Sequence, residues 1–304
     1  MTERRHSLSS TAARFLSART HPTPVQGATP PLDNRATGTN VGLKRSALKA
    51  VVPSCGTGEA MGRIEDAVRL LDLFWEGEEL GVREMARRLA LSKSSVHRLA
   101  SELERVGFLS RDHDTGRYRL GLRLLQYGGL FQLNNDLIRE ALPLLRSLMR
   151  ITGETVHLAA LEDGQVVYLV KLESPNSINM PSWVGWRNPA HCTAVGKALL
   201  AYQEQALIER VLARGLRRFT PNTIADPERL RAHLEQVRRE GVAFDQEERR
   251  TGLRCVGAPV LGEGGIAIAS ISVAGPASRL TPSRMAQLAL LVKEAAGAIA
   301  SRLS

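Results

Sequence analysis

Residues 79–121 read ELGVREMARRLALSKSSVHRLASELERVGFLSRDHDTGRYRLG, and this stretch decides the fold of the N-terminal region. Apolar residues at helical spacing predict two amphipathic helices, one with Val82, Met85, Ala86 and Leu89 and the next with Val96, Leu99, Leu103 and Val106. Only Ala90 and Leu91 separate the first helix from Ser92, a hydroxyl residue suited to capping the second. Two helices joined by so short a turn and followed by a hairpin predict a winged helix-turn-helix.

The second helix, residues 92–106, carries hydrogen-bond donors and no acid on the outward face of its first turns. Hydroxyl, Lys, His and Arg side chains at this position suit the DNA major groove, where phosphates and guanine edges accept hydrogen bonds. We therefore interpret this segment as a recognition helix. Its candidate DNA contacts are Lys93, Ser94, Ser95, His97 and Arg98.

A basic wing is predicted after the recognition helix, with strand-like runs at 108–111 and 117–120 around a turn. Tyr118 and Leu120 are expected to face inward, which leaves Arg117 and Arg119 outside, within reach of phosphates or a minor groove. An upstream helix is predicted to complete the core with an apolar face of Ile64, Ala67, Val68, Leu71, Phe74 and Trp75. A plain interaction module has the same element order, and the basic wing favours DNA.

Length and charge bound the rest of the 304-residue chain, which should hold about two domains. The formal net charge is +10, and half of it belongs to residues 1–60, which hold eight Lys or Arg and three Asp or Glu. This tail is rich in Ser, Thr, Pro and Arg and has no apolar periodicity, so we expect a disordered basic arm. A true start at Met61 is the alternative.

Several classes of protein find no support in the sequence. It has neither a secretory signal nor a run of about 18 apolar residues, so no membrane span is expected. The three cysteines are far apart and form no Cys-x-x-Cys, which fits a reduced cytoplasm. Walker and dinucleotide fingerprints are absent, so we expect no nucleotide cofactor.

The remaining chain predicts a linker helix and an α+β domain. We assign residues 61–123 to the winged helix, 124–150 to the linker helix, with Pro143 as its only kink, and 151–304 to the second domain. The predicted strands are 155–161, 165–172, 253–261 and 266–274, and the predicted helices are 193–203, 204–213, 227–240 and 282–302. The sheet is expected to be mainly antiparallel, with helices on one or both faces.

Three segments of the second domain then resemble a known family. Residues 191–200, HCTAVGKALL, resemble the H-x-T-A-x-G-K-A-L-L segment of IclR-type transcription regulators. Residues 241–248, GVAFDQEE, with 252–260, GLRCVGAPV, are similar to the second signature of the family, and 270–276, SISVAGP, to its third. The order of winged helix, linker helix and effector domain also matches, so the resemblance covers about residues 62–303.

The resemblance implies a GAF-like effector domain that binds a small organic acid, whether a sugar acid, an aromatic acid or a keto acid. It also implies that double-stranded operator DNA is bound by a homodimer, often within a dimer of dimers. The effector contacts implied by position are Ala194, Val195, Asp245, Cys255 and Ser272. Backbone N–H groups at the start of the helix near 193–203 would favour a ligand carboxylate. The chain departs from the family pattern at Asn188 and Ala274.

Alternatives remain open at this point. His191 and Cys192, with Cys255 elsewhere, could suggest a Cys nucleophile, although neighbours in a strand or loop rarely point at one another, so we expect no enzyme. Scattered ligands such as His157 would be needed for a metal site, and none is assigned. An architectural DNA-binding protein with a vestigial sensor is a further possibility. Trp183 and Trp186 could form a lid or pack on the surface, and Glu247 and Glu248 are expected on a solvated face.

Overall fold

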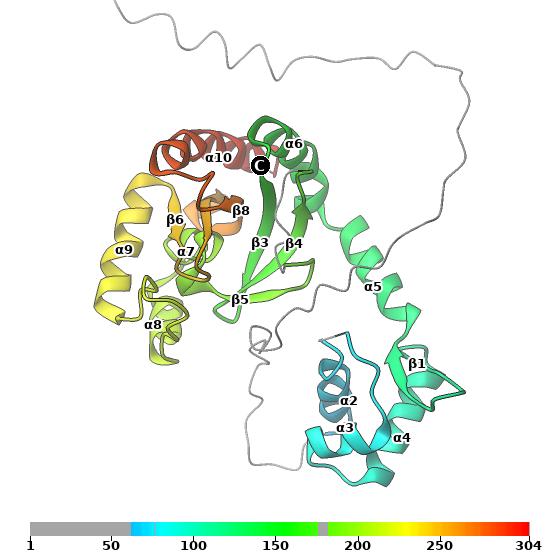
Figure 1. Cartoon of the computed structure of the whole chain (residues 1–304). Helices are drawn as coiled ribbons and strands as arrows, with labels where there is room; N and C mark the ends of the chain where they lie inside the picture. Colours follow the sequence, from blue (N-terminus) through cyan, green and yellow to red (C-terminus); the bar gives the residue numbers. More distant parts are fainter. Residues whose placement is uncertain (1–61, 76, 176–181, 304) are drawn as a thin grey trace, which may run out of the picture. The chain divides into compact units, whose positions relative to one another are not determined.

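The computed structural model describes residues 62–75, 77–175 and 182–303 (Figure 1). The predicted tail, residues 1–60, lies outside these ranges. Within them the chain forms a small helical region with a two-stranded hairpin, then a region of helices around a larger sheet. The predicted α+β class is confirmed, and each region is described by itself below.

The first region is a winged helix-turn-helix. Its elements are α2 (Arg63–Asp72), α3 (Val82–Leu89), α4 (Lys93–Arg105), β1 (Leu109–Arg111) and β2 (Tyr118–Leu120). The predicted cap is present, because Ser92 Oγ accepts a hydrogen bond of 3.1 Å from Ser95 N. The turn is closed by Ala90, whose φ of 56° ends α3 in the left-handed conformation. Met85, Val96 and Tyr118 are completely buried between the helices and the hairpin.

Two sequence-based assignments of inward faces were only partly correct. Of the predicted face of the first helix, Ala67, Leu71 and Phe74 lie in or against the core, whereas Ile64, Val68 and Trp75 are 83%, 53% and 39% exposed. Leu70, which was not predicted, is completely buried. Apolar residues lie on two adjacent stripes of this helix, and only packing against the neighbouring helices selects one of them. In the wing Tyr118 is buried as predicted, but Leu120, the cross-strand partner of the buried Leu109, is 46% exposed.

The predicted linker helix is divided into two helices, α5 (Leu122–Leu133) and α6 (Asp136–Thr152). The break has a local cause, since the Asn135 side chain accepts a 3.1 Å hydrogen bond from Ile138 N and begins a new helix. Pro143 lies inside α6 and does not end it. The inner face of α6 packs into the core of the second region, whereas α5 buries no residue.

The second region is built on a six-stranded antiparallel sheet in the order β5-β4-β3-β8-β7-β6. The strands are β3 (Thr155–Glu162), β4 (Gln165–Leu172), β5 (Arg187–Pro189), β6 (Ala243–Gln246), β7 (Leu253–Leu261) and β8 (Ala267–Pro276). The sequence predicted the four long strands at nearly these bounds. The short edge strands β5 and β6 were not predicted, because three or four residues give too little alternation.

Helices cover both faces of this sheet (Figure 1). They are α6, α7 (Ala194–Leu200), α8 (Gln205–Ala213), α9 (Pro227–Glu240) and α10 (Pro282–Leu303), with short 3-10 turns η2 (Ala190–Cys192) and η3 (Glu263–Gly265). One face carries Val256, Ile271 and Val273 against α6 and α10. The opposite face packs against α7, around which α8 and α9 complete a second core. No helix in the described ranges is long and apolar enough to cross a membrane.

Candidate functional site

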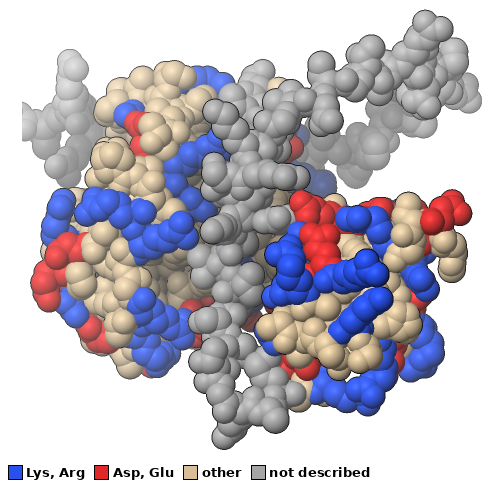
Figure 2. All heavy atoms as spheres, turned by 60° about the horizontal axis from the view of Figure 1, so that its bottom comes forward, with Lys and Arg blue, Asp and Glu red and all other residues tan. Residues whose placement is uncertain are grey.

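The first half of α4 presents every predicted DNA contact to solvent. Lys93, Ser94, Ser95, His97 and Arg98 are all exposed, whereas Val96 between them is completely buried. Two of the hydroxyls are partly engaged in the helix cap, since the oxygens of Ser94 and Ser95 lie 3.0 and 2.8 Å from Ser92 Oγ. Figure 2 shows Lys and Arg side chains spread over the winged-helix region, with acidic side chains among them.

The two predicted wing arginines differ in their contacts. Arg117 donates from Nε to the Glu79 carbonyl oxygen over 3.0 Å, donates to the same oxygen from Nη2, and lies 3.8 Å from the Glu84 carboxylate. This guanidinium therefore helps to hold the hairpin against the start of α3. Arg119 is exposed and makes no such contact within the described residues, which leaves its guanidinium available to a phosphate.

The predicted effector residues come together on one face of the larger sheet. Asp245 pairs with Cys255 across β6 and β7, and Cys255 pairs with Ala274 on β8. Two residues further along, Gly257 pairs with Ser272. Because side chains two residues apart share a face, Asp245, Cys255 and Ser272 all point to the side that α7 covers. Asp245 and Ser272 are 1% and 3% exposed, and Cys255 is partly buried.

Two glycines allow α7 to lie directly on this face. A Cβ on Gly257 would stand 2.9 Å from the Ala194 carbonyl carbon and 3.1 Å from Val195 N. A Cβ on Gly196 would stand 2.3 Å from the Ala190 carbonyl oxygen. Thr193 caps the helix by accepting a 3.1 Å hydrogen bond from Gly196 N. The first residues of α7, including the predicted contacts Ala194 and Val195, are thereby seated beside Ser272.

Further polar side chains on the same face were not assigned as effector contacts from the sequence. Thr155 and His157 of β3 pair with Ala274 and Ser272, which places them in the same two rows of residues. The Thr155 hydroxyl is buried and has no hydrogen-bond partner among the described residues. His157 Nε2 lies 3.1 Å from Ser182 Oγ, and Lys171 Nζ donates to Ser182 O over 2.6 Å. The alternation of polar and apolar residues in Thr-Val-His-Leu of β3 was the sequence signal that could have placed Thr155 and His157 on this face.

Burial changes the charge of this face. It raises the pKa of Asp245 to about 7, although Lys197 acts in the opposite direction. Burial also lowers the pKa of His157 to about 3, and nearby Lys171 adds to this effect. Between about pH 3 and pH 7 both groups are therefore mainly uncharged. An anionic ligand would meet neutral hydrogen-bonding groups instead of an ionised carboxylate.

Lys197 and Glu248 form a buried ion pair behind α7. The Lys197 side chain is fully buried and that of Glu248 is 6% exposed, while the Glu248 backbone N–H donates to Asp245 Oδ1 over 2.7 Å. The expectation that Glu247 and Glu248 lie on a solvated face was therefore wrong, since Glu247 also pairs with Arg254 at 3.1 Å. A lysine within the apolar run AVGKALLA was the signal that could have identified the pair.

The side chains behind the alternative interpretations are largely buried. Trp186 is buried, and its ring centroid lies 3.7 Å from that of the partly exposed Trp183, so the two rings pack against each other. Burial raises the pKa of the Cys192 and Cys255 thiols, which opposes formation of a nucleophilic thiolate. Within the described ranges no group of three or more His, Cys, Asp or Glu side chains is placed to hold a metal ion.

Comparisons with known proteins agree with this architecture. The model of the bacterial transcriptional regulator IclR C-terminal domain matches residues 132–301, and the IclR helix-turn-helix model matches residues 64–113. The HTH-type transcriptional regulator KdgR of Escherichia coli K12 is 35% identical over 236 residues, which cover 77% of this chain and 89% of that protein. The matched regions include α4 and the sheet face described above.

Two solved structures extend the comparison. The Thermotoga maritima IclR structure has a TM-score of 0.65 and 32% identity, and the match covers 79% of this chain and 98% of that chain. An IclR homologue from Microbacterium hydrocarbonoxydans, solved in complex with 4-hydroxybenzoate, has a TM-score of 0.70 and 28% identity, covering 80% of this chain and 100% of that chain. With its winged helix, its buried polar sheet face and both matching domain models, the chain belongs to the IclR family of bacterial transcriptional regulators.

Proposed function

We propose that this protein regulates transcription by binding operator DNA with an affinity that a small organic acid controls. The acid would bind the sheet face formed by Ala194, Val195, Asp245, Cys255 and Ser272. The observation that carries the proposal is the buried, unpartnered Thr155 hydroxyl on the same face as Ser272 and Asp245, because a buried polar group without a partner indicates a missing ligand or water. Operator DNA would be bound in the cytoplasm.

The chemistry of this face suits an acid better than a neutral apolar ligand. Lys171, 12% exposed, forms an ion pair with Glu173 and donates to Ser182 O near this face, and hydroxyl donors stand at Thr155 and Ser272. A carboxylate needs several such donors when it leaves water. The homologue solved with 4-hydroxybenzoate shows that a relative of this fold holds an aromatic acid. Sugar acids and keto acids present the same carboxylate and remain within the proposal.

A second copy of the chain would complete the DNA-binding form. Several apolar residues of α5 are not covered by the described part of the chain, with Leu122, Leu125 and Leu133 at 82%, 73% and 75% exposed. An apolar helix that buries none of its residues is typical of a protein interface. We propose that this helix pairs with its counterpart in a homodimer, from which a dimer of dimers can form. Leu125→Glu should shift the protein toward monomer in sedimentation analysis, and an unchanged molecular mass would contradict this interface.

The decisive experiment separates sensing from DNA binding. A double variant with Asp245→Ala and Ser272→Ala should lose the response to organic acids, because it removes contacts that distinguish the ligand-bound state. Its operator affinity without ligand should stay within about threefold of wild type, since neither residue belongs to the winged helix. Thermal-shift screening of small organic acids against the wild type would supply the ligand, followed by isothermal titration and operator gel shifts.

Each outcome of that experiment has a distinct meaning. If the double variant keeps native ligand affinity, the effector site lies elsewhere. If it folds normally but loses operator binding without ligand, these residues belong to the coupling framework, and the site assignment is wrong. A wild type whose operator affinity responds to no organic acid would instead favour a ligand-independent architectural protein.

A further inference from the structure

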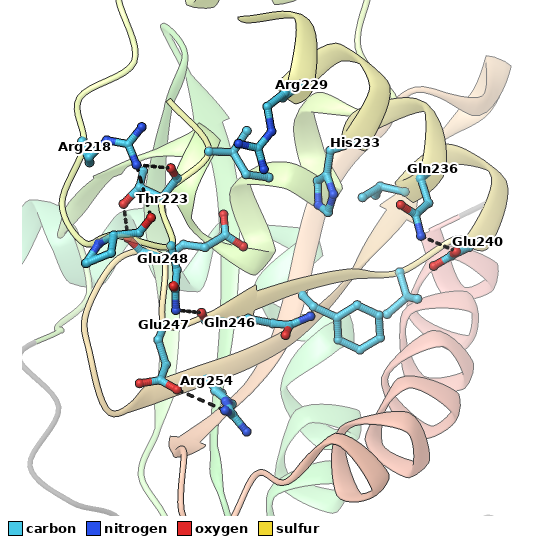
Figure 3. A pocket seen from close by; sticks show the side chains of 16 residues that line it. Arg218, Thr223, Arg229, His233, Gln236, Glu240, Gln246, Glu247, Glu248 and Arg254 are labelled. Carbon is cyan, nitrogen blue, oxygen red and sulfur yellow. Dashed lines mark hydrogen bonds and ion pairs between the residues drawn. The ribbon is translucent and has the colours of Figure 1, made fainter. Parts of the chain in front are cut away.

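A groove at the β6 edge of the sheet has features that the proposed effector face does not use. It lies beside α9 and β6 and encloses about 740 Å³ (Figure 3). Its walls are formed by the loop at 218–224, by α9 residues on the side toward the sheet, and by residues 242–248. None of the five proposed effector residues lines it. An inference about this groove therefore goes beyond the proposed function.

Three of the residues that line the groove contain a buried polar atom with an unmet hydrogen bond. Within the described part of the chain, His233 Nε2, Glu248 Oε2 and Arg254 Nε have no hydrogen-bond partner. Leaving one such atom unpaired costs about 1–3 kcal/mol, and folded proteins pair nearly all of them. Three around one groove therefore point to an occupant that supplies both donors and acceptors.

The three atoms need different hydrogen-bonding groups from that occupant. Glu248 Oε2 needs a donor, because the other carboxylate oxygen of Glu248 already accepts from Lys197. Arg254 Nε needs an acceptor. His233 can take either role, since burial lowers its pKa to about 4 and keeps the imidazole neutral near pH 7. A hydroxyl group, which both donates and accepts, is the simplest group that satisfies each of these requirements.

One end of the groove is also cationic. Arg229 makes no side-chain hydrogen bond or ion pair in the described ranges, and Arg218 donates only to the carbonyl oxygens of Pro221 and Thr223. Figure 3 shows both arginines at the end away from Glu240, with the Glu248 carboxylate directed toward Arg229 and His233. Glu248 and Arg254 are already neutralised by Lys197 and Glu247. The uncompensated guanidinium groups are suited to a carboxylate.

We propose that this groove is a second ligand site, which takes a small polyhydroxylated carboxylic acid. The carboxylate lies against Arg229 and Arg218, and the hydroxyl groups donate to Glu248 and accept from Arg254 and His233. A chain of about six carbons fits within the enclosed volume, which lies in the range of small-molecule sites. An occupant at Glu248 would touch a residue whose other oxygen holds Lys197 of α7.

Isothermal titration of the full chain with D-gluconate tests the site. Sorbitol lacks the carboxylate and hexanoate lacks the hydroxyl groups, so each should bind at least tenfold more weakly than gluconate. Arg229→Ala should weaken gluconate binding by at least tenfold. Arg239→Ala is the matched control, because Arg239 is exposed on the same helix and does not line the groove, and it should leave binding within twofold.

A Ser272→Ala variant distinguishes this site from the proposed effector face. Gluconate affinity should stay within twofold in that variant, because Ser272 does not contact the groove. If Ser272→Ala abolishes gluconate binding and Arg229→Ala does not, gluconate occupies the effector face, and the groove proposal is wrong while the proposed function stands. Failure of gluconate to bind the wild type, or equal binding of sorbitol or hexanoate, would also overturn the groove proposal. If organic acids leave the operator affinity unchanged but gluconate still binds through Arg229, only the proposed function is contradicted.

Discussion

The outer face of α4 and the covered face of the larger sheet place polar side chains in opposite environments. On α4 the predicted DNA contacts are all exposed, whereas Val96, Ala100 and Leu103 of the same helix are buried. On the sheet Thr155, His157, Asp245 and Ser272 are each 4% exposed or less. DNA is a large, highly charged partner that comes to the surface, whereas a small ligand must be enclosed to gain enough contact.

This difference determines how each site depends on the fold. The α4 side chains are exposed, so replacing one should change binding without changing stability. The sheet side chains have lost water, and their ionisation and pairing are part of the stability of the region. Variants of the two regions should therefore separate into those that affect DNA binding and those that affect unfolding.

The largest expected effect is on the buried ion pair. Lys197→Met leaves the Glu248 carboxylate buried without its counter-ion, which should destabilise the second region by about 3–5 kcal/mol. Arg139→Ala is the control, because its pair with Asp136 joins side chains 61% and 72% exposed, and its loss should change stability far less. Denaturant unfolding followed by circular dichroism measures both. Equal losses of unfolding free energy in the two variants would mean that the buried pair stabilises the protein no more than the exposed pair does.

The recognition helix should give the next largest effect, and on a different quantity. Arg98→Ala and Lys93→Ala should each weaken operator binding by about 1–3 kcal/mol if the contact is to a base. Arg105→Ala, in the last turn of the same helix, serves as the control and should change affinity little. Gel shifts with an operator fragment measure affinity, and thermal unfolding should be unchanged. Native affinity in both variants would reject α4 as the recognition helix.

A smaller effect is expected from the titration of Asp245. Its pKa in the folded protein, about 7, lies above the value of about 3.9 expected for an unfolded chain. The folded state therefore holds a proton that the unfolded state releases, so the stabilisation is complete below about pH 4 and is lost as pH rises through 7. The contribution falls by at most about 1.4 kcal/mol per pH unit. Asp245→Asn should remove this dependence, and an unchanged slope between pH 5 and 7 would contradict it.

The smallest effect separates the two wing arginines. Arg119→Ala should lower the dependence of log K on log salt by about one unit, as expected for the loss of one phosphate contact. Arg117→Ala should change it less, because that guanidinium is bound to the Glu79 carbonyl oxygen and lies near Glu84. Operator titrations at several salt concentrations measure the slopes. A change of preference at one base pair with the slope intact would show that the wing reads bases.

Much of the fold could be predicted from the sequence, because the long elements have a regular pattern. Helical spacing identified α3 and α4, and alternation with a turn signal identified β3 and β4. The failures lie where the pattern allows two solutions or is too short. Both stripes of α2 are apolar, β6 has four residues, and the break at Asn135 depends on one side-chain cap.

The candidate site also has a part that the sequence predicted and a part that it could not. The resemblance to the family named the five effector residues, and the sheet register brings them to one face, although their role remains a proposal. Lys197 and Glu248 are 51 positions apart in the sequence, so no local pattern could pair them. The groove near Arg229 likewise joins a loop, a helix and an edge strand.

The sequence by itself determined the winged helix, the exposed polar face of α4 and the membership of the family, because periodicity, capping and motif spacing are local properties of the chain. Only the tertiary structure decided which polar residues lose water. The buried Lys197–Glu248 pair, the raised pKa of Asp245 and the unpartnered atoms of Thr155 and His233 all arise when distant segments enclose them. Burial is set by all the neighbours of a residue in space, and most of those neighbours are remote in the sequence.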